Sequence, residues 1–225
     1  MRINNLQVYD MHNSIRASGY PMKAHLDVED QHRFLDEKDW KRAVSLASRA
    51  SNEGHDNFLS GIVVSFDLTC TVKMWTEFER YHFAQIVSSQ STMHRLSKME
   101  LDTAFTPYTD PEIVNRLKVL QKRYEEEPNE TNYLQLLYSC PTGLYLTARV
   151  TTNYRQLKTM IRQRHNHRLP EWRKFCDEIL EQCPMAAEFL LGKGDIRNEV
   201  THIENQKAVR TCISAKENDQ RLSGS

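Results

Sequence analysis

The stretch RYHFAQIVSSQSTMHRLSKM, from Arg80 to Met99, combines cationic side chains with hydroxyl and amide groups. Arg80 and Arg95 flank a run of serine and glutamine residues. Guanidinium groups bind phosphate through two parallel hydrogen bonds, and serine hydroxyls and backbone N–H groups can complete such a site. The stretch therefore predicts a local anion site. The alternative is an exposed polar hairpin, because runs of this kind are also common in loops.

A second basic cluster extends from Arg155 to Lys174. Most charge runs form a solvated helix face, and this interpretation is expected here for Lys158, Arg162 and Arg173. Arg164 differs because it continues the inward side of the apolar stripe formed by Leu157, Met160 and Ile161. A buried arginine needs a buried acid or a phosphate, since an unpaired buried charge is very costly.

The histidines and cysteines do not predict a metal centre. The five cysteines show no CxxC spacing and their number is odd, so we expect reduced thiols without a zinc knuckle or a disulfide framework. The sequence His165, Asn166, His167 lacks further ligands at useful spacing. His55, between Gly54 and Asp56, could be a turn histidine or could present its imidazole plane to a cofactor.

Composition limits the possible partners. The chain has 225 residues, a formal net charge of +0 and a pI of about 7.1, so no global charge favours a nucleic-acid polymer or an anionic membrane. It contains no apolar run of the roughly 20 residues that a membrane span needs, and its first residues lack the pattern of a signal peptide. We expect one cytoplasmic domain.

Hydrophobic periodicity predicts the elements that would position these residues. A helix over 38–50 begins after the N-cap Asp36. A half-buried strand over 61–72 follows, because apolar and polar residues alternate there. A short helix over 73–81 then carries Arg80 at its C-terminal edge.

The second half of the chain continues the mixture of helices and strands. Its predicted elements are a helix from Pro111 to before Pro128, a helical stretch over 133–138, a strand over 143–151, a helix capped by Asn153, a helix opened by Pro170 and a short helix to about Leu191. We interpret residues 1–35 as an N-terminal arm or irregular segment, 36–192 as the domain and 193–225 as a polar tail. The fold class is α+β.

The order of these motifs resembles that of the flavin-dependent thymidylate synthases. That family has a Gly-His-rich junction, a strand, and a helix that ends in an Arg-His-Arg triplet, which reads Arg80, Tyr81, His82 here. A Ser/Asn/Glu/Ser/Arg/Tyr signature follows, and HRLSKM aligns with its end. The family's late Asn-x-Arg-Ser-Leu helix reads NYRQL here, from Asn153, and reaches Arg164 at the family's spacing. The resemblance covers about residues 43–191.

The resemblance implies a single α+β domain with a central sheet flanked by helices, assembled as a homotetramer whose active sites are built from several subunits. It implies an enzyme that binds FAD and uses NADPH and methylenetetrahydrofolate as co-substrates to methylate C5 of dUMP. The implied flavin contacts are His55, Asn57, His82, Phe83, Asn153 and Arg155. The implied nucleotide contacts are Arg80, Gln90, Ser91, Arg95 and Arg164, and Arg80 is the implied catalytic residue.

Three alternatives remain open from the sequence. Ser91, Met93 and Leu137 stand where the family has other side chains, which allows C5 methylation or hydroxymethylation of another pyrimidine nucleotide. A nucleotide- or flavin-binding module without turnover is a second alternative. A nucleic-acid-associated protein that uses the cluster from Arg155 to Lys174 is the third.

Overall fold

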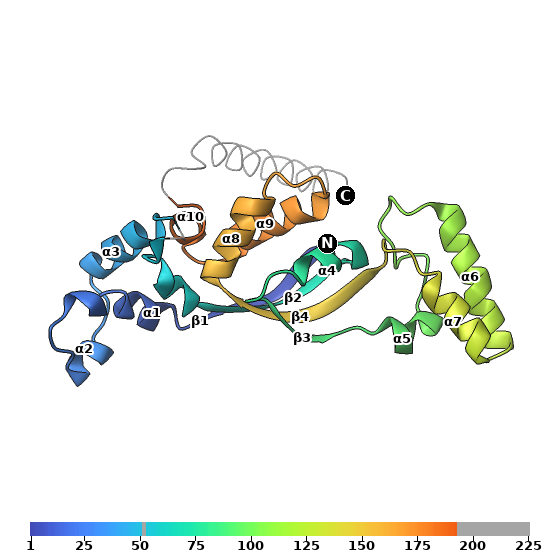
Figure 1. Cartoon of the computed structure of the whole chain (residues 1–225), viewed down its shortest axis with the longest axis horizontal. Helices are drawn as coiled ribbons and strands as arrows, with labels where there is room; N and C mark the ends of the chain where they lie inside the picture. The colour runs from blue at the N-terminus through green and yellow to red at the C-terminus, as the bar shows by residue number, and fades with distance from the viewer. Residues whose placement is uncertain (51–52, 193–225) are drawn as a thin grey trace, which may run out of the picture.

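The computed structural model describes residues 1–50 and 53–192, so the tail expected at 193–225 lies outside the described residues. A four-stranded antiparallel sheet forms the centre (Figure 1). Its strands lie in the order β1 (Arg2–Tyr9), β2 (Val63–Thr71), β4 (Tyr145–Asn153) and β3 (Gln85–Ser89). Helices flank this sheet, which confirms the predicted α+β fold class.

The inner strands β2 and β4 follow the predicted alternation. Val64, Phe66 and Leu68 of β2 are fully buried, while Ser65, Asp67 and Thr69 remain partly exposed. The buried side chains contact helices that lie on the same face of the sheet, α4 (Val72–Phe78), α8 (Tyr154–Arg164) and α9 (Pro170–Gln182) (Figure 1).

Aromatic side chains fill the space between the sheet and these helices. Phe66 packs against Phe175 of α9 with ring centroids 6.0 Å apart. Phe78 of α4 stacks on Trp172 of α9, also at 6.0 Å. Burial of large aromatic rings contributes strongly to the stability of a core, so this layer fixes α4 and α9 on the sheet.

The predicted helix starts are confirmed by their capping bonds. Asp36 accepts a hydrogen bond from the backbone N–H of Asp39 and begins α3 (Glu37–Ala47). Asn153 accepts one from the backbone N–H of Gln156 and begins α8. Such caps satisfy N–H groups that have no partner within the helix.

The interpretation of residues 1–35 as an arm or irregular segment is wrong for much of its length. The segment contains the edge strand β1, followed by α1 (Met11–Ala17), the 3₁₀ turn η1 (Tyr20–Met22) and α2 (Val28–His32). In β1 only Ile3 is buried, and a β-bulge interrupts the pairing with β2 between Asn4 and Gln7. Leu6 and Val8 pack against the core and alternate with exposed Gln7 and Tyr9, but the irregularity after Ile3 breaks the alternation, so the sequence pattern is too short to predict the strand.

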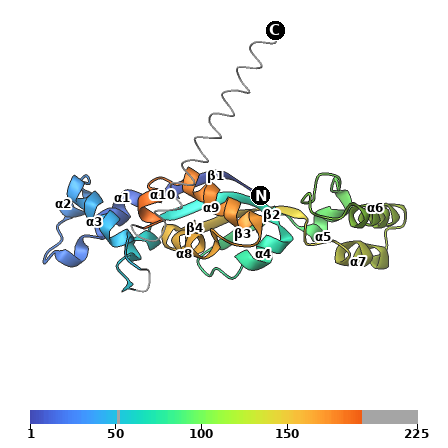
Figure 2. The same cartoon turned by 90° about the horizontal axis from the view of Figure 1, so that it is seen from above.

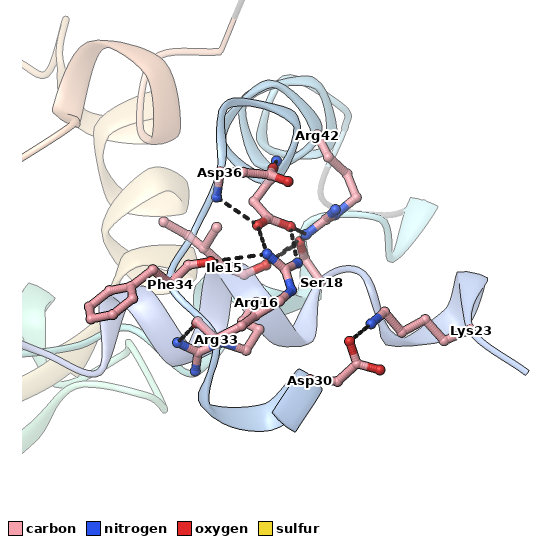
Figure 3. A network of polar contacts seen from close by, with 10 residues as sticks. Ile15, Arg16, Ser18, Lys23, Asp30, Arg33, Phe34, Asp36 and Arg42 are labelled. Carbon is pink, nitrogen blue, oxygen red and sulfur yellow. Dashed lines mark hydrogen bonds and ion pairs between the residues drawn. The ribbon is translucent and has the colours of Figure 1, made fainter. Parts of the chain in front are cut away.

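A polar network attaches this N-terminal segment to α3 (Figure 3). The carboxylate of Asp39, which is 1% exposed, accepts two hydrogen bonds from Arg33, at 2.6 and 2.7 Å, and a third from Arg42 at 2.7 Å. Arg16 of α1 donates to the backbone carbonyl of Arg33. Asp39 of α3 thus binds Arg33 in the chain after α2, and the carbonyl of Arg33 in turn binds Arg16 of α1.

The opposite end of the molecule forms a separate hydrophobic cluster. It is built by α5 (Thr92–Arg95), the turn η4 (Leu96–Lys98), α6 (Pro111–Glu126) and α7 (Glu130–Tyr138). Leu117, Leu120 and Leu136 meet Leu96 in this cluster. The views in Figures 1 and 2 agree on an elongated molecule, with α1 to α3 at one end and α6 and α7 at the other. No helix in the described part of the chain meets the length and apolarity that a membrane span requires.

Candidate functional site

The residues implied as flavin contacts come from three chain segments that meet at one end of the sheet. His55 lies just before the turn η3 (Asn57–Ser60), which leads into β2. Asn153 is the last residue of β4 and pairs with Val63, the first residue of β2. Phe83 lies two residues before Gln85, which pairs with Thr151 of β4. The sheet register therefore brings these positions to the same end.

Their side chains are accessible and chemically varied. His55, Asn57, His82 and Phe83 are exposed, and Phe83 is 69% exposed despite its apolar ring. The side chain of Asn153 is already used, because its Oδ1 accepts the N–H of Gln156 at 2.9 Å. This end of the sheet thus presents the imidazoles of His55 and His82 and the phenyl ring of Phe83 beside polar groups.

An ion-paired cluster lies directly beneath His55. Asp56 is fully buried, and its carboxylate lies 3.3 Å from Nε of Arg155 and 2.8 Å from Nζ of Lys158. Lys158 is 2% exposed, so its expected place on a solvated helix face is wrong. The helical spacing from Leu157 and Ile161 placed it next to the apolar stripe, but nothing in the sequence indicated an acid for it to pair with.

The strand β3 provides the Ser/Gln stretch with a regular structure that the sequence did not predict. All its residues are exposed, and it pairs through one edge with β4. Directly after it, Gln90 exchanges two hydrogen bonds with Thr147: its N–H donates to the carbonyl, and its Oε1 accepts from the backbone N–H, each at 2.9 Å. Ser91 precedes α5, and Arg95 is exposed at the end of that helix.

The implied nucleotide contacts do not gather around one point within the chain. Thr147, opposite Gln90, is four residues from Thr151, which is about 14 Å along an extended strand. Gln90, Ser91 and Arg95 therefore lie well away from the implied flavin contacts His55, Asn57, His82, Phe83, Asn153 and Arg155, which we call the flavin set. Arg80, exposed two residues after the end of α4, instead lies in the same segment as His82 and Phe83 of the flavin set.

Arg164 occupies a partly buried aromatic environment. Its guanidinium carbon lies 4.9 Å from the ring centroid of Trp172, and its Nε donates to the hydroxyl of Tyr81 at 2.8 Å. Its NH1 lies 3.3 Å from Glu77. Glu77 is thus the acid that an inward-facing arginine was expected to need. Sequence reasoning missed Glu77 because its partner lies on a different helix.

Glu77 itself is held by several donors. Its carboxylate accepts from Nε1 of Trp172 at 3.0 Å, and Nζ of Lys73 lies 3.0 Å away. Burial raises the pKa of Glu77, but the hydrogen bonds from Lys73 and Trp172 outweigh this effect and leave the pKa below its ordinary value. The carboxylate therefore stays ionised at neutral pH and can compensate the charge of Arg164.

Several cavities in the described part of the chain lie away from the flavin set. One, of about 640 Å³, is lined by Thr71, Tyr108 and Leu169 among others. A second, of about 410 Å³, is lined by Met99 and Gln121 among others, and a third, of about 190 Å³, includes Trp75 and Ile86. None of these three is lined by a residue implied as a site residue.

The cysteine thiols of the described chain are poorly suited to nucleophilic catalysis. Burial raises the pKa of Cys140 to about 11 and that of Cys176 and Cys183 to about 12. Thiolate is the reactive form, so these side chains are inert at neutral pH. Among residues 1–50 and 53–192, no cluster of three His, Cys, Asp or Glu side chains could hold a metal ion.

The residues at the sheet's end fit the chemistry of a flavin dinucleotide. Aromatic planes such as those of His55 and Phe83 can stack on a ring system. A guanidinium such as that of Arg155 suits a pyrophosphate, and the exposed amide of Asn57 can both donate and accept hydrogen bonds.

Comparison with known proteins identifies the fold. No family model and no curated protein matches the sequence. A crystal structure of flavin-dependent thymidylate synthase ThyX from Helicobacter pylori, complexed with FAD and dUMP, aligns with 84% of this chain and 97% of its own, at 14% identity and a TM-score of 0.67. A second ThyX structure from the same organism, also with FAD and dUMP, gives the same coverage, 15% identity and a TM-score of 0.65. The chain therefore has the fold of the flavin-dependent thymidylate synthases, as its motif order had predicted.

Proposed function

We propose that this chain is an FAD-dependent enzyme of the thymidylate synthase type, which methylates C5 of dUMP with methylenetetrahydrofolate and a nicotinamide reductant such as NADPH. The observation that carries the proposal is the meeting of His55, Phe83, Asn153 and Arg155 at one end of the sheet, although they come from three distant segments. The fold shared with FAD- and dUMP-bound proteins supports the same assignment.

In this proposal His55, Asn57, His82, Phe83, Asn153 and Arg155 hold the flavin. When bound, the flavin would supply the reducing equivalents of the reaction, while the protein provides binding and orientation. Arg80 would stabilise the negative charge that develops on the uracil carbonyls when C5 becomes nucleophilic. Arg95 and Arg164 would bind the 5′-phosphate, and Gln90 and Ser91 would contact the nucleotide.

A homotetramer would explain the distribution of these residues. Within one chain the Gln90 to Arg95 region is separated from the flavin set along β4. Contacts between neighbouring copies would bring the two groups of residues together. We therefore propose that each active site is shared between subunits.

The first test is a visible absorption spectrum of the purified protein with and without added FAD, followed by size exclusion. We expect bound oxidised flavin in a tetramer, and then formation of dTMP from dUMP, methylenetetrahydrofolate and NADPH. Arg80→Ala should retain FAD and lose turnover by about 100-fold or more, in line with the loss of one transition-state charge contact. A colourless tetramer that ignores FAD would refute the proposal.

The second candidate function is a nucleotide- or flavin-binding module without turnover. Two implied nucleotide contacts favour it, because the side chain of Gln90 is engaged by Thr147 and Arg164 is engaged by Glu77 and Tyr81. A panel of dUMP, UMP and dCMP separates the possibilities. Turnover of dUMP alone supports thymidylate synthesis, turnover of another nucleotide indicates a different pyrimidine substrate, and FAD binding without any turnover supports the module.

A further inference from the structure

Lys158 of α8 is a buried cation with every donor satisfied. Its Nζ donates to the backbone carbonyls of Ala47 and Arg49 and to the carboxylate of Asp56, each at 2.8 Å. An ammonium group has three N–H donors, so these three acceptors account for all of them. The side chain therefore has no free donor for solvent or for a ligand.

The three acceptors belong to two different places in the chain. Ala47 is the last residue of α3, and Arg49 follows two residues later, so Lys158 binds carbonyls at the C-terminal end of that helix. The cation is favourable there because the last carbonyls of a helix lack partners within the helix and carry partial negative charge. The third acceptor, Asp56, immediately follows His55.

This arrangement fixes the backbone directly after His55 to α8. Asp56 is joined to Lys158 and to Arg155 of the same helix, and Asn57 begins the turn η3, which also packs against α8. The imidazole of His55 is itself exposed, so burial of its own ring does not hold it. Its position depends on the anchored residue beside it.

Ion pairing alone does not explain a lysine at this place. Burial of two charges costs several kcal/mol, and a well-packed apolar pair is often equally stable, so a buried pair is weak evidence for a stabilising role. Such a pair does fix geometry, because neither charge can move away from the other without a large loss. A precise position is what a cofactor-contacting segment needs.

We propose that Lys158 is a positioning residue for the flavin site, which holds His55 and Asn57 in place by clamping Asp56 to the end of α3. This inference rests on the proposed function for its consequence, the binding of FAD. Its structural content, the restraint of residues 53–57 by Lys158, can be measured in the protein without any ligand.

The test compares three variants in the full chain. Lys158→Met removes the clamp and leaves Asp56 buried with one cation fewer. The double variant Lys158→Met/Asp56→Asn also removes the clamp but relieves that buried charge, so its melting temperature should exceed that of the single variant. Lys122→Met is the matched control, because Lys122 lies on α6 and its side chain is 76% exposed.

A role of Lys158 in positioning the site and a role only in stability predict different FAD affinities for the single and double variants. If Lys158 positions the site, both clamp-free variants should bind FAD at least about tenfold more weakly than the wild type, although their melting temperatures differ. Lys122→Met should bind like the wild type. If FAD affinity instead recovers in the double variant together with its melting temperature, Lys158 acts only on stability and the proposal is overturned.

Hydrogen–deuterium exchange separates a failure of this inference from a failure of the proposed function. Without flavin, the double variant should exchange faster than the wild type at residues 53–57, with no change in β2. Lys158→Arg keeps the charge, but its planar guanidinium does not match the three acceptors, so the exchange rate at residues 53–57 should rise less than in the double variant. If the methionine variants do not fold, this variant tests the clamp in their place. Unchanged exchange at 53–57 would refute the clamp, whereas a wild type that lacks FAD binding but shows the clamp refutes only the flavin site.

Discussion

At the level of single residues, two acids hold separate parts of the chain together, Asp39, which is buried, and Glu77, which is partly buried. Glu77 compensates Arg164 between α4 and α8, and Asp39 compensates Arg33 and Arg42 beside the N-terminal helices. Both acids have partners on other segments, so each contributes to tertiary structure as well as to local charge balance. The two differ in what they connect, and each makes its own prediction.

Removal of Glu77 should destabilise the domain. In Glu77→Ala the guanidinium of Arg164 and the indole N–H of Trp172 lose their shared acceptor, and Arg164 is only 16% exposed in its side chain. We expect a loss of about 2 kcal/mol in the free energy of unfolding, measured with urea. Glu126→Ala, which removes an exposed acid from α6, should change it by less than about 0.5 kcal/mol. Equal effects would contradict a special role for Glu77.

Asp39 should make stability depend on pH in the acid range. Hydrogen bonds from Arg33 hold the pKa of Asp39 well below its ordinary range, against the opposing effect of burial. Because the folded pKa is depressed, the contribution of Asp39 is present above the unfolded pKa of about 4 and is lost as the pH falls toward the folded value. The difference in melting temperature between wild type and Asp39→Asn should thus be constant from pH 7 to 5 and shrink below about pH 4. A constant difference down to pH 3 would contradict this linkage.

At the scale of elements, the sheet's register and the helix starts bring the flavin set together. Asn153 ends β4, pairs with the first residue of β2 and caps α8, so one residue links two strands to the helix that carries Arg155 and Lys158. The turn η3 packs on the same helix. The start of α8 therefore positions the proposed site.

The cap at Asn153 can be tested against a cap elsewhere. Asn129 caps α7 in the same way, because its Oδ1 accepts a hydrogen bond from the backbone N–H three residues later, also at 2.9 Å. Asn153→Ala and Asn129→Ala should each lower the free energy of unfolding by about 1 kcal/mol. Only Asn153→Ala should also weaken FAD binding, as measured by flavin fluorescence titration. Equal FAD affinities in the two variants would argue against a flavin site at the start of α8.

For the whole molecule, the edge of the sheet formed by β3 is the surface that bears on assembly. Among the residues that the structure describes, β3 pairs with β4 alone, and Ile86 and Val87 are 38% and 63% exposed. Exposed edge strands with apolar side chains tend to associate with other chains unless they are covered. The proposed tetramer would cover this edge.

A charge on this edge should therefore weaken assembly. Val87→Lys places an ammonium on the exposed strand without disturbing the buried core, and should shift the protein toward smaller species in size exclusion while its melting temperature at low concentration stays unchanged. Val119→Lys is the matched control, because Val119 is 55% exposed on α6 at the far end of the molecule. Assembly that survives Val87→Lys as well as Val119→Lys would place the contacts between subunits elsewhere.

Elements whose stabilisation is local or periodic could be predicted from the amino-acid sequence. The alternation of apolar and polar residues predicted the buried face of β2. The side-chain chemistry of Asn153 predicted its cap, and the restricted backbone of Pro170 predicted the start of α9. The structure confirms all three. The order of motifs also determined the fold. These features need no knowledge of distant partners, since neighbouring residues supply the physical cause.

Features that depend on distant partners could not be predicted from the sequence, because they form only when the chain folds. The strand β1 exists because its backbone groups pair with β2, although only Ile3 is buried. Lys158 is buried because Asp56 and the end of α3 surround it, and Arg164 is paired because α4 brings Glu77 to it. A charge in the sequence predicts a solvated side chain until a partner removes the cost of burial, and that partner is a property of the fold.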